Sequence, residues 1–99
     1  MSDADFFAPP PFVAADALPK LQRELRALGL AERAGVFERR GIAIVRAAID
    51  GAVVQAAVVK RPARAGPEWQ PKTLKSAADV RDFVADLKRR LAGWSDRDD

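Results

Sequence analysis

The sequence predicts a single α+β domain with the order helix, three strands, helix, in which a three-stranded antiparallel meander carries both helices on one face. Three observations predict this fold: leucines at helical spacing between 18 and 28, β-branched and small residues with turn signals between 36 and 60, and an apolar stripe at helical spacing between 80 and 91. Ninety-nine residues are the length of one domain. We expect a folded core over 14–94, a Phe/Pro-rich arm over 1–13 and a solvated tail over 95–99.

The first helix is expected to begin at Asp16, a favourable N-cap residue, with Pro19 in its first turn. Gly29 supplies the C′ residue that ends it. The leucines of its apolar face are Leu18, Leu21, Leu25 and Leu28. Before this helix, three consecutive prolines at 9–11 favour an extended polyproline arm. The phenylalanines around them offer aromatic side chains for packing on an apolar surface: Phe6, Phe7 and Phe12.

The central segment is predicted to form a hairpin. Asp50-Gly51 is a preferred pair for a two-residue type I′ turn, which would place Ile49 opposite Ala52. A turn near Arg40-Gly41 would add a strand over 36–39, in which the face taken by Phe37 stays open. In this register one sheet face is apolar throughout and is expected to pack on the helices; it carries Ala43, Val45, Ala47, Ile49, Ala52, Val54, Ala56 and Val58.

The opposite face of this hairpin is also largely apolar. Arg46 and Gln55, expected as cross-strand partners, are its polar members beside Ile42, Ile44, Ala48, Val53, Ala57 and Val59. A sheet face in water is normally more polar, so we expect a cover: the arm, a second subunit or a ligand. One interpretation of the chain is therefore a protein-interaction or homodimerisation module, whose interface candidates are Phe7, Phe12, Ile42, Ile44, Val53 and Val59.

The last helix is expected to begin at Ser76, with Asp79 completing a variant of the capping box. Its apolar stripe consists of Val80, Phe83, Val84, Leu87 and Leu91. Gly93 is expected to end it, and Trp94 to fold back on the core.

The composition disfavours several classes of function. The chain has no cysteine, histidine or tyrosine, so thiolate chemistry and the commonest general base and metal ligand are missing. Phosphate-cradling glycine loops and metal-ligand spacings are also absent from the sequence. We therefore expect a non-enzymatic protein with no cofactor and no metal. The apolar stretches are too short for a membrane span and the N-terminus is acidic, which predicts a cytoplasmic protein without a membrane partner. Twelve arginines against five lysines, and many alanines, suggest a small bacterial protein from a GC-rich genome.

The basic stretch from 60 to 75 is the best-organised functional signal. It holds five cations and one acid, Glu68, around a tryptophan between Pro67 and Pro71. Loops this long are uncommon unless they serve a function, and prolines stiffen this one. Clustered cations favour phosphate backbones, and an exposed indole can stack on an unpaired base. The predicted nucleic-acid-binding residues are Lys60, Arg61, Arg64, Trp69, Lys72 and Lys75. The alternative is a solvated surface with the indole folded onto the core.

Two resemblances follow from these elements. Residues 45–84, with Val45-Arg46 in a strand, Gly51 in a turn, the loop GPEWQPK and a serine-started helix, resemble the positive cofactor four family of transcriptional coactivators. That resemblance implies a dimer that binds single-stranded DNA on a curved sheet, with Lys60, Arg61, Trp69 and Lys72 facing the DNA. The sequence departs from the family by its first helix and by alanines where the family's sheet has aromatics.

The order helix, three strands, helix is also similar to the double-stranded-RNA-binding domain. This similarity implies phosphate contacts by Lys72 and Lys75 at the start of the last helix. The long loop and the absence of histidine are departures from that domain.

Overall fold

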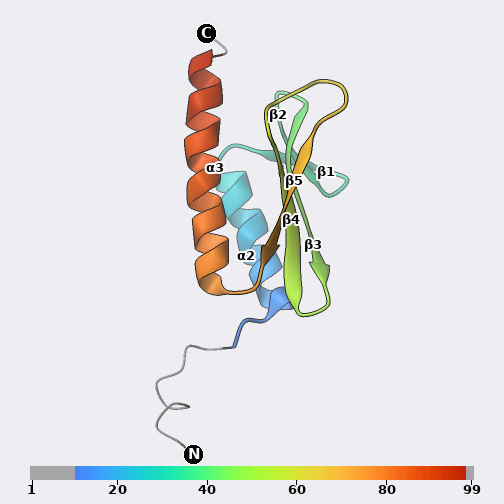
Figure 1. Cartoon of the computed structure of the whole chain (residues 1–99), viewed down its shortest axis with the longest axis vertical. Helices are drawn as coiled ribbons and strands as arrows, with labels where there is room; N and C mark the ends of the chain where they lie inside the picture. The colour runs from blue at the N-terminus through green and yellow to red at the C-terminus, as the bar shows by residue number, and fades with distance from the viewer. Residues whose placement is uncertain (1–10, 98–99) are drawn as a thin grey trace, which may run out of the picture.

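A computed structural model of the chain describes residues 11–97, with side chains described over 11–94. The described residues form two helices and five strands in the order α2 (Ala14–Ala27), β1 (Ala31–Arg33), β2 (Val36–Arg39), β3 (Ile42–Asp50), β4 (Val53–Val59), β5 (Trp69–Leu74) and α3 (Ala77–Arg97). The strands make one antiparallel sheet in sequence order, and both helices lie on the same side of it (Figure 1). The predicted α+β class is confirmed, but three strands were too few. The observed order also differs from the one on which the similarity to the double-stranded-RNA-binding domain was based.

The hydrophobic core lies between the sheet and the two helices. Phe37, whose direction the sequence left open, is 1% exposed and belongs to this core. Trp94 is buried as well, as expected. Each fully buried aliphatic or aromatic side chain contributes about 1.5–3 kcal/mol relative to an exposed one. The largest fully buried side chains are Phe37, Leu21, Leu25, Ile44, Leu87, Val45, Val54, Val58 and Val59.

Helix α2 begins earlier than its sequence predicts. Its N-cap is Val13, which makes no side-chain cap hydrogen bond, and Asp16 lies inside the first turn. The prediction of Asp16 as N-cap was wrong, and the burial of Ala14 in the core accounts for the earlier start. The C-terminus is as predicted: Gly29 has φ +89° and donates its N–H to the carbonyl of Arg26 at 2.9 Å, in a Schellman arrangement.

The first two hairpins use the same turn chemistry. Arg40 and Gly41, with φ of 56° and 77°, connect β2 to β3 as predicted. Ala34 and Gly35, with φ of 52° and 81°, connect β1 to β2, a hairpin that the sequence did not predict. Two successive positive φ values define the type I′ turn, whose twist matches that of the flanking strands.

The turn between β3 and β4 corrects the predicted register. Asp50 is paired with Val53, so the turn residues are Gly51 and Ala52, and of these Gly51 has the positive φ, 61°. Glycine at the first central position is the requirement of a type II′ turn, whereas the prediction placed it second in a type I′ turn. The register therefore moves by two residues. An even shift leaves both sheet faces as predicted but changes the partners along them.

A bulge between β2 and β3 overturns part of the predicted outer face. The register shifts between Phe37, paired with Val45, and Glu38, paired with Ala43. Ile44 is the extra residue of β3 at this point and is buried in the core. Because a bulge breaks the alternation of a strand, the residues before it cannot be assigned to faces by counting from the turn. The prediction of Ile44 as an outer-face residue open to a partner was wrong.

Strand β5 replaces much of the predicted long loop. It runs antiparallel to β4, from the pair Val59 and Trp69 to the pair Val54 and Leu74. Proline at position 71 is tolerated because β5 is an edge strand, where one backbone donor is not needed by the sheet. The connection to β4 is thereby reduced to residues 60–68, closed by a hydrogen bond of 3.0 Å from the Lys60 N–H to the Glu68 carbonyl.

Helix α3 begins as predicted and ends later. The Asp79 N–H donates to Ser76 Oγ at 3.1 Å, and the Lys75 N–H donates to Asp79 Oδ2 at 2.9 Å. Gly93 does not end the helix, which continues to Arg97. The helical spacing of the buried residues Leu87, Leu91 and Trp94 explains this, because folding the indole onto the core requires the helix to continue through it. The part of the predicted tail up to residue 97 is therefore helical, and residues 98–99 lie outside the described ones.

Candidate nucleic-acid interface

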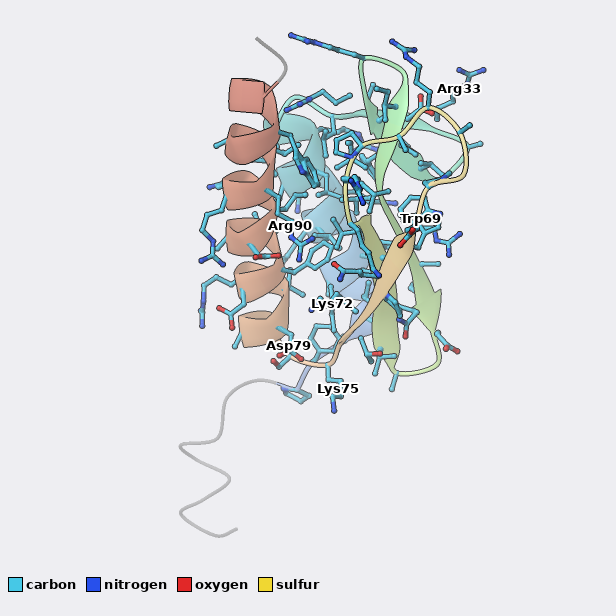
Figure 2. The ribbon with its side chains drawn as sticks, turned by 45° about the horizontal axis from the view of Figure 1, so that its top comes forward. Arg33, Trp69, Lys72, Lys75, Asp79 and Arg90 are labelled. Carbon is cyan, nitrogen blue, oxygen red and sulfur yellow. The ribbon has the colours of Figure 1, made fainter. Side chains whose placement is uncertain are left out.

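The alternation of β5 divides the predicted basic stretch between the two faces of the sheet. Leu74 is buried in the core, and Gln70 Oε1 accepts a hydrogen bond of 3.1 Å from Arg90 of α3, so these residues face the helices. Lys72 lies between them and shares their face. Trp69 points away from the helices, and Figure 2 shows it and Lys72 on different sides of the strand. Lys72 and Trp69 therefore do not belong to one surface.

Trp69 lies on the helix-free face and is neither fully buried nor fully exposed. Its side chain is partly buried and packs against the core cluster beside its cross-strand partner Val59. The guanidinium carbon of Arg46 lies over the indole, 4.6 Å from the ring centroid, which is a cation–π geometry. The indole is thus fixed in place by the sheet and by one arginine. It is neither a core residue nor a free surface side chain.

A row of directly paired residues crosses this face from one edge of the sheet to the other. It consists of Arg33, Val36, Arg46, Ala57 and Pro71, one from each strand. Adjacent strands are about 4.8 Å apart, and two strand spacings separate the two arginines, so their backbones lie about 10 Å from each other. Both side chains are exposed.

Both arginines of this row were missing from the predicted site. Arg46 was recognised as a polar member of the outer face, but with Gln55 as its partner. Gln55 is instead opposite Ala48 and accepts a hydrogen bond of 2.9 Å from Thr73. Arg33 carried no sequence signal, because the three residues of β1 are all exposed and show no alternation.

The loop after β4 adds cations next to the tryptophan. Lys60 directly follows Val59, the partner of Trp69, and Arg61 and Arg64 are exposed further along the loop. Lys60 Nζ lies 3.4 Å from Glu68 Oε2, but both side chains are more than half exposed. An ion pair of this kind contributes at most about 1 kcal/mol, so it leaves Lys60 available to another anion.

The six predicted nucleic-acid residues therefore form three groups. Lys60, Arg61, Arg64 and Trp69 belong to the helix-free face and its loop. Lys72 lies on the opposite face beside α3, and Lys75 lies at the start of α3, at one end of a groove between the helices. Arg46 joins the first group through its contact with Trp69, and Arg33 lies in the same cross-sheet row as Arg46.

The predicted partner interface is mostly occupied by the chain itself. Ile44 and Val59 are buried, at 1% and 0% exposure, and have no surface to offer a partner. Phe12 is partly buried against the core. Ile42 and Val53 are partly exposed, and Phe7 lies outside the described residues.

Within the part of the chain that the structure describes, no three carboxylate, histidine or cysteine side chains come together as metal ligands. No helix over these residues has the length and apolar character needed to cross a membrane. No family model, no curated protein and no solved structure matched the chain. The class of the protein is therefore described by its fold and surface: it is an α+β domain with a five-stranded antiparallel sheet, one face of which carries Trp69 and cations.

Proposed function

We propose that this protein binds single-stranded nucleic acid on the helix-free face of its sheet, with Trp69 stacking on an unpaired base. The observation that carries the proposal is the Arg46–Trp69 pair, an indole held on the sheet surface and bordered by cations. Arg33 lies in the same cross-sheet row, and the loop over 60–68 begins beside the indole. The resemblance to the positive cofactor four family points to the same class of ligand.

A single strand fits this surface better than a duplex. The bases of a duplex are stacked on one another, whereas those of a single strand are open to aromatic side chains. Cations near the indole would hold the phosphates on either side of the stacked base. Neither base stacking nor phosphate binding requires a groove, so an open sheet face is sufficient for both.

The arginine over the indole does not block this role. A cation–π contact at an exposed site contributes about 0.5–1 kcal/mol, whereas stacking of a base on an aromatic side chain contributes about 1–3 kcal/mol. Arg46 is exposed, so its guanidinium can leave the ring without breaking a buried contact. A base then takes its position on the indole, and the displaced guanidinium is free to bind a phosphate.

The proposed phosphate contacts are the cations around Trp69: Arg33, Arg46, Lys60, Arg61 and Arg64. Lys72 and Lys75, which the sequence included, are left out because they belong to other surfaces. For single strands the logarithm of the binding constant falls by about 0.7 per phosphate contact for each tenfold rise in salt. With at most five phosphate contacts, the slope of the logarithm of the binding constant against the logarithm of the salt concentration should be about −3.5 or shallower.

The test is a titration of the ¹⁵N-labelled protein with an oligothymidylate at low and at physiological salt. The chain has two tryptophans, one on the proposed surface and one in the core, so the two indole N–H resonances provide a probe and an internal control. We expect the Trp69 indole and the amides of 60–68 to shift at low salt, with the Trp94 indole unchanged. If the resonances of Trp69 and the loop stay in place at low salt, the proposal is wrong.

Homodimerisation or protein binding through the outer face is the second interpretation of the sequence. Ile44 and Val59 are buried. Ile42 is paired with Arg39, whose guanidinium donates to the Leu91 carbonyl of α3, so Ile42 lies on the helix-facing side. Of the four predicted sheet residues, Val53 remains partly exposed on the outer face, which therefore has less apolar surface than the sequence implied. Sedimentation across protein concentrations tests it: a salt-insensitive dimer would support this interpretation against the nucleic-acid one.

A further inference from the structure

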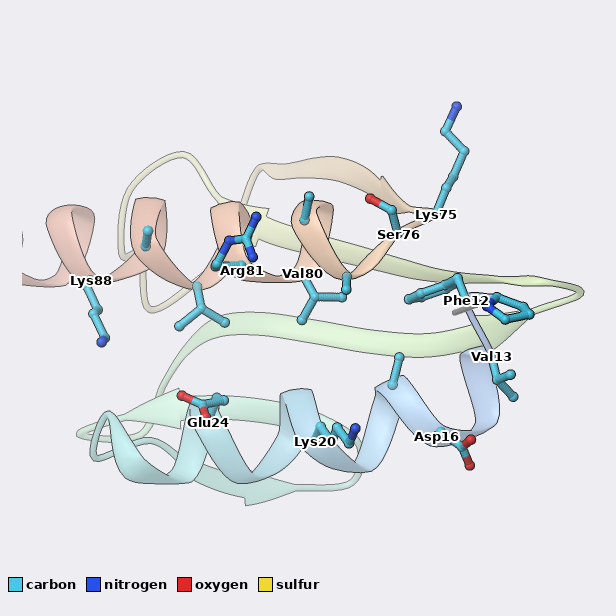
Figure 3. A pocket seen from close by; sticks show the side chains of 16 residues that line it. Phe12, Val13, Asp16, Lys20, Glu24, Lys75, Ser76, Val80, Arg81 and Lys88 are labelled. Carbon is cyan, nitrogen blue, oxygen red and sulfur yellow. The ribbon is translucent and has the colours of Figure 1, made fainter. Parts of the chain in front are cut away.

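A groove of about 1040 Å³ runs between the two helices. It is lined by residues of α2, of α3 and of the segments that precede them, and no strand contributes to it. Its apolar side chains include Phe12, Ala17, Val80 and Val84, and Phe12 lies at the end where both helices begin (Figure 3). The groove is therefore separate from the sheet face that carries Trp69.

The borders of this groove are basic. Lys20 of α2, Arg81 and Lys88 of α3, and Lys75 at the shared end are all exposed, against two acids, Asp16 and Glu24. None of these four cations forms an ion pair with another residue over 11–94.

Three other cations of the helices are matched by acids of the same chain, whereas Arg23 of α2 is exposed, has no ion pair with another residue over 11–94 and does not line the groove. Arg89 and Arg90 share the carboxylate of Asp86 at 3.1 and 2.8 Å, and Arg26 bonds Glu32 at 2.7 Å. Among the cations of the helices and of the start of α3 over 11–94, four of the five without an ion pair therefore border the apolar groove between α2 and α3.

We propose that this groove binds an acidic amphipathic helix of a partner protein. The two helices that form it run in the same direction, and its α3 side extends from residue 77 to residue 88. At 1.5 Å per residue this is about 17 Å, or three helical turns. A guest helix of about 12 residues would place apolar anchors at i, i+3, i+4 and i+7 along the groove, and its carboxylates would meet the cations on the borders.

The chemistry of the groove favours this occupant over others. Its apolar side chains are mostly aliphatic and small, including Ala78 and Ala85, so a guest backbone can approach closely but bases find little to stack on. They also lie in a concavity, whereas a membrane surface requires an apolar ridge that can enter the lipid. A second copy of the same groove would bring like charges together, which disfavours self-pairing.

The probe is a synthetic peptide of about 12 residues with leucines at the four anchor positions and glutamates on its flanks. Two control peptides are needed: one of the same composition with the leucines dispersed, and one with lysines in place of the glutamates. We expect the acidic amphipathic peptide alone to shift the amide resonances of Ala17, Val80 and Val84 in the full chain.

Charge reversal then separates specific docking from general attraction. The double variant Arg81→Glu, Lys88→Glu should bind the acidic peptide at least about tenfold more weakly and should gain affinity for the lysine peptide. Its matched control is Arg61→Glu, Arg64→Glu, which makes the same change in net charge on the loop after β4. This control should keep the peptide affinity and lose oligothymidylate binding. The proposal is wrong if the acidic peptide leaves the groove resonances unchanged, or if both double variants weaken peptide binding equally.

Discussion

The guanidinium of Arg46 on β3 reaches across β4 to the indole of Trp69 on β5, with 4.6 Å between guanidinium carbon and ring centroid. The strand between them makes this contact possible, since the residue opposite Arg46 is Ala57, whose methyl group leaves room above the sheet. The pair links the centre of the sheet to its edge strand.

Replacement of Trp69 by alanine should weaken binding of oligothymidylate by about 1–3 kcal/mol, because a base loses its stacking partner. Trp69→Phe, which keeps an aromatic ring, should lose less. Fluorescence anisotropy of a labelled oligonucleotide measures both. Equal affinities for the wild-type and alanine proteins, with the fold intact by circular dichroism, would contradict the proposed stack.

Arg46→Gln should reduce the affinity and also flatten the salt dependence by about 0.7 in slope, the contribution of one phosphate contact on a single strand. Lys72→Gln removes the same charge from the opposite face of the sheet and should change neither quantity. Titrations at several salt concentrations provide the slopes. A Lys72 variant as impaired as the Arg46 variant would argue for diffuse attraction instead of a defined face.

Phe37→Ala should lower the free energy of unfolding by about 3–5 kcal/mol, because a buried aromatic side chain is removed from the core. Phe12→Ala, at a partly buried position beside the core, should cost clearly less. Urea unfolding followed by circular dichroism gives both values. Comparable losses would mean that the segment before α2 is as much a part of the core as β2.

Ser76→Ala should lower the free energy of unfolding by about 1 kcal/mol, because the Asp79 N–H then loses its side-chain acceptor. Ser76→Asp supplies another good N-cap acceptor and should be nearly neutral. The variants are compared by the midpoints of their urea unfolding curves, provided that the slope of the free energy of unfolding against urea concentration is the same. If the aspartate variant were as unstable as the alanine one, the hydroxyl would be needed for something other than capping.

Two glycine replacements should have opposite signs. Gly51 has φ +61°, where a side chain is strained, so Gly51→Ala should destabilise the protein by about 1–2 kcal/mol. Gly93 lies within α3 with open space around its Cα, so Gly93→Ala should stabilise it by about 0.5–1 kcal/mol. Thermal unfolding distinguishes the two directions. A destabilised Gly93 variant would show that α3 does not continue through this position.

The features that the sequence predicted correctly are those with local causes. The leucine spacing and Gly29 define the end of α2, Ser76 begins α3, and Arg40-Gly41 forms the turn between β2 and β3. The errors in the helix boundaries arose where packing against the rest of the fold decides how far a helix extends. Burial of Ala14 extends one helix at its start, and burial of Trp94 extends the other at its end.

The candidate site was predictable only in part, because side-chain direction depends on register. Trp69, Lys60, Arg61 and Arg64, which the sequence groups by their proximity in the chain, lie on the helix-free face and in the loop that follows β4. Lys72 lies on the opposite face, which the sequence analysis missed because it took β5 for a loop, and a loop has no alternating faces. Arg33 enters the site from a strand of three residues that no hydrophobic pattern marks.

Proline at position 71 has a consequence for self-association. Edge strands with free backbone donors and acceptors are templates for adding further strands, and therefore for fibrillar aggregation. On β5 the proline removes one of those donors, and at the other edge β1 offers only three residues. Neither edge suits lateral growth of the sheet, so the protein should stay dispersed at high concentration while its helix-free face remains open to a ligand.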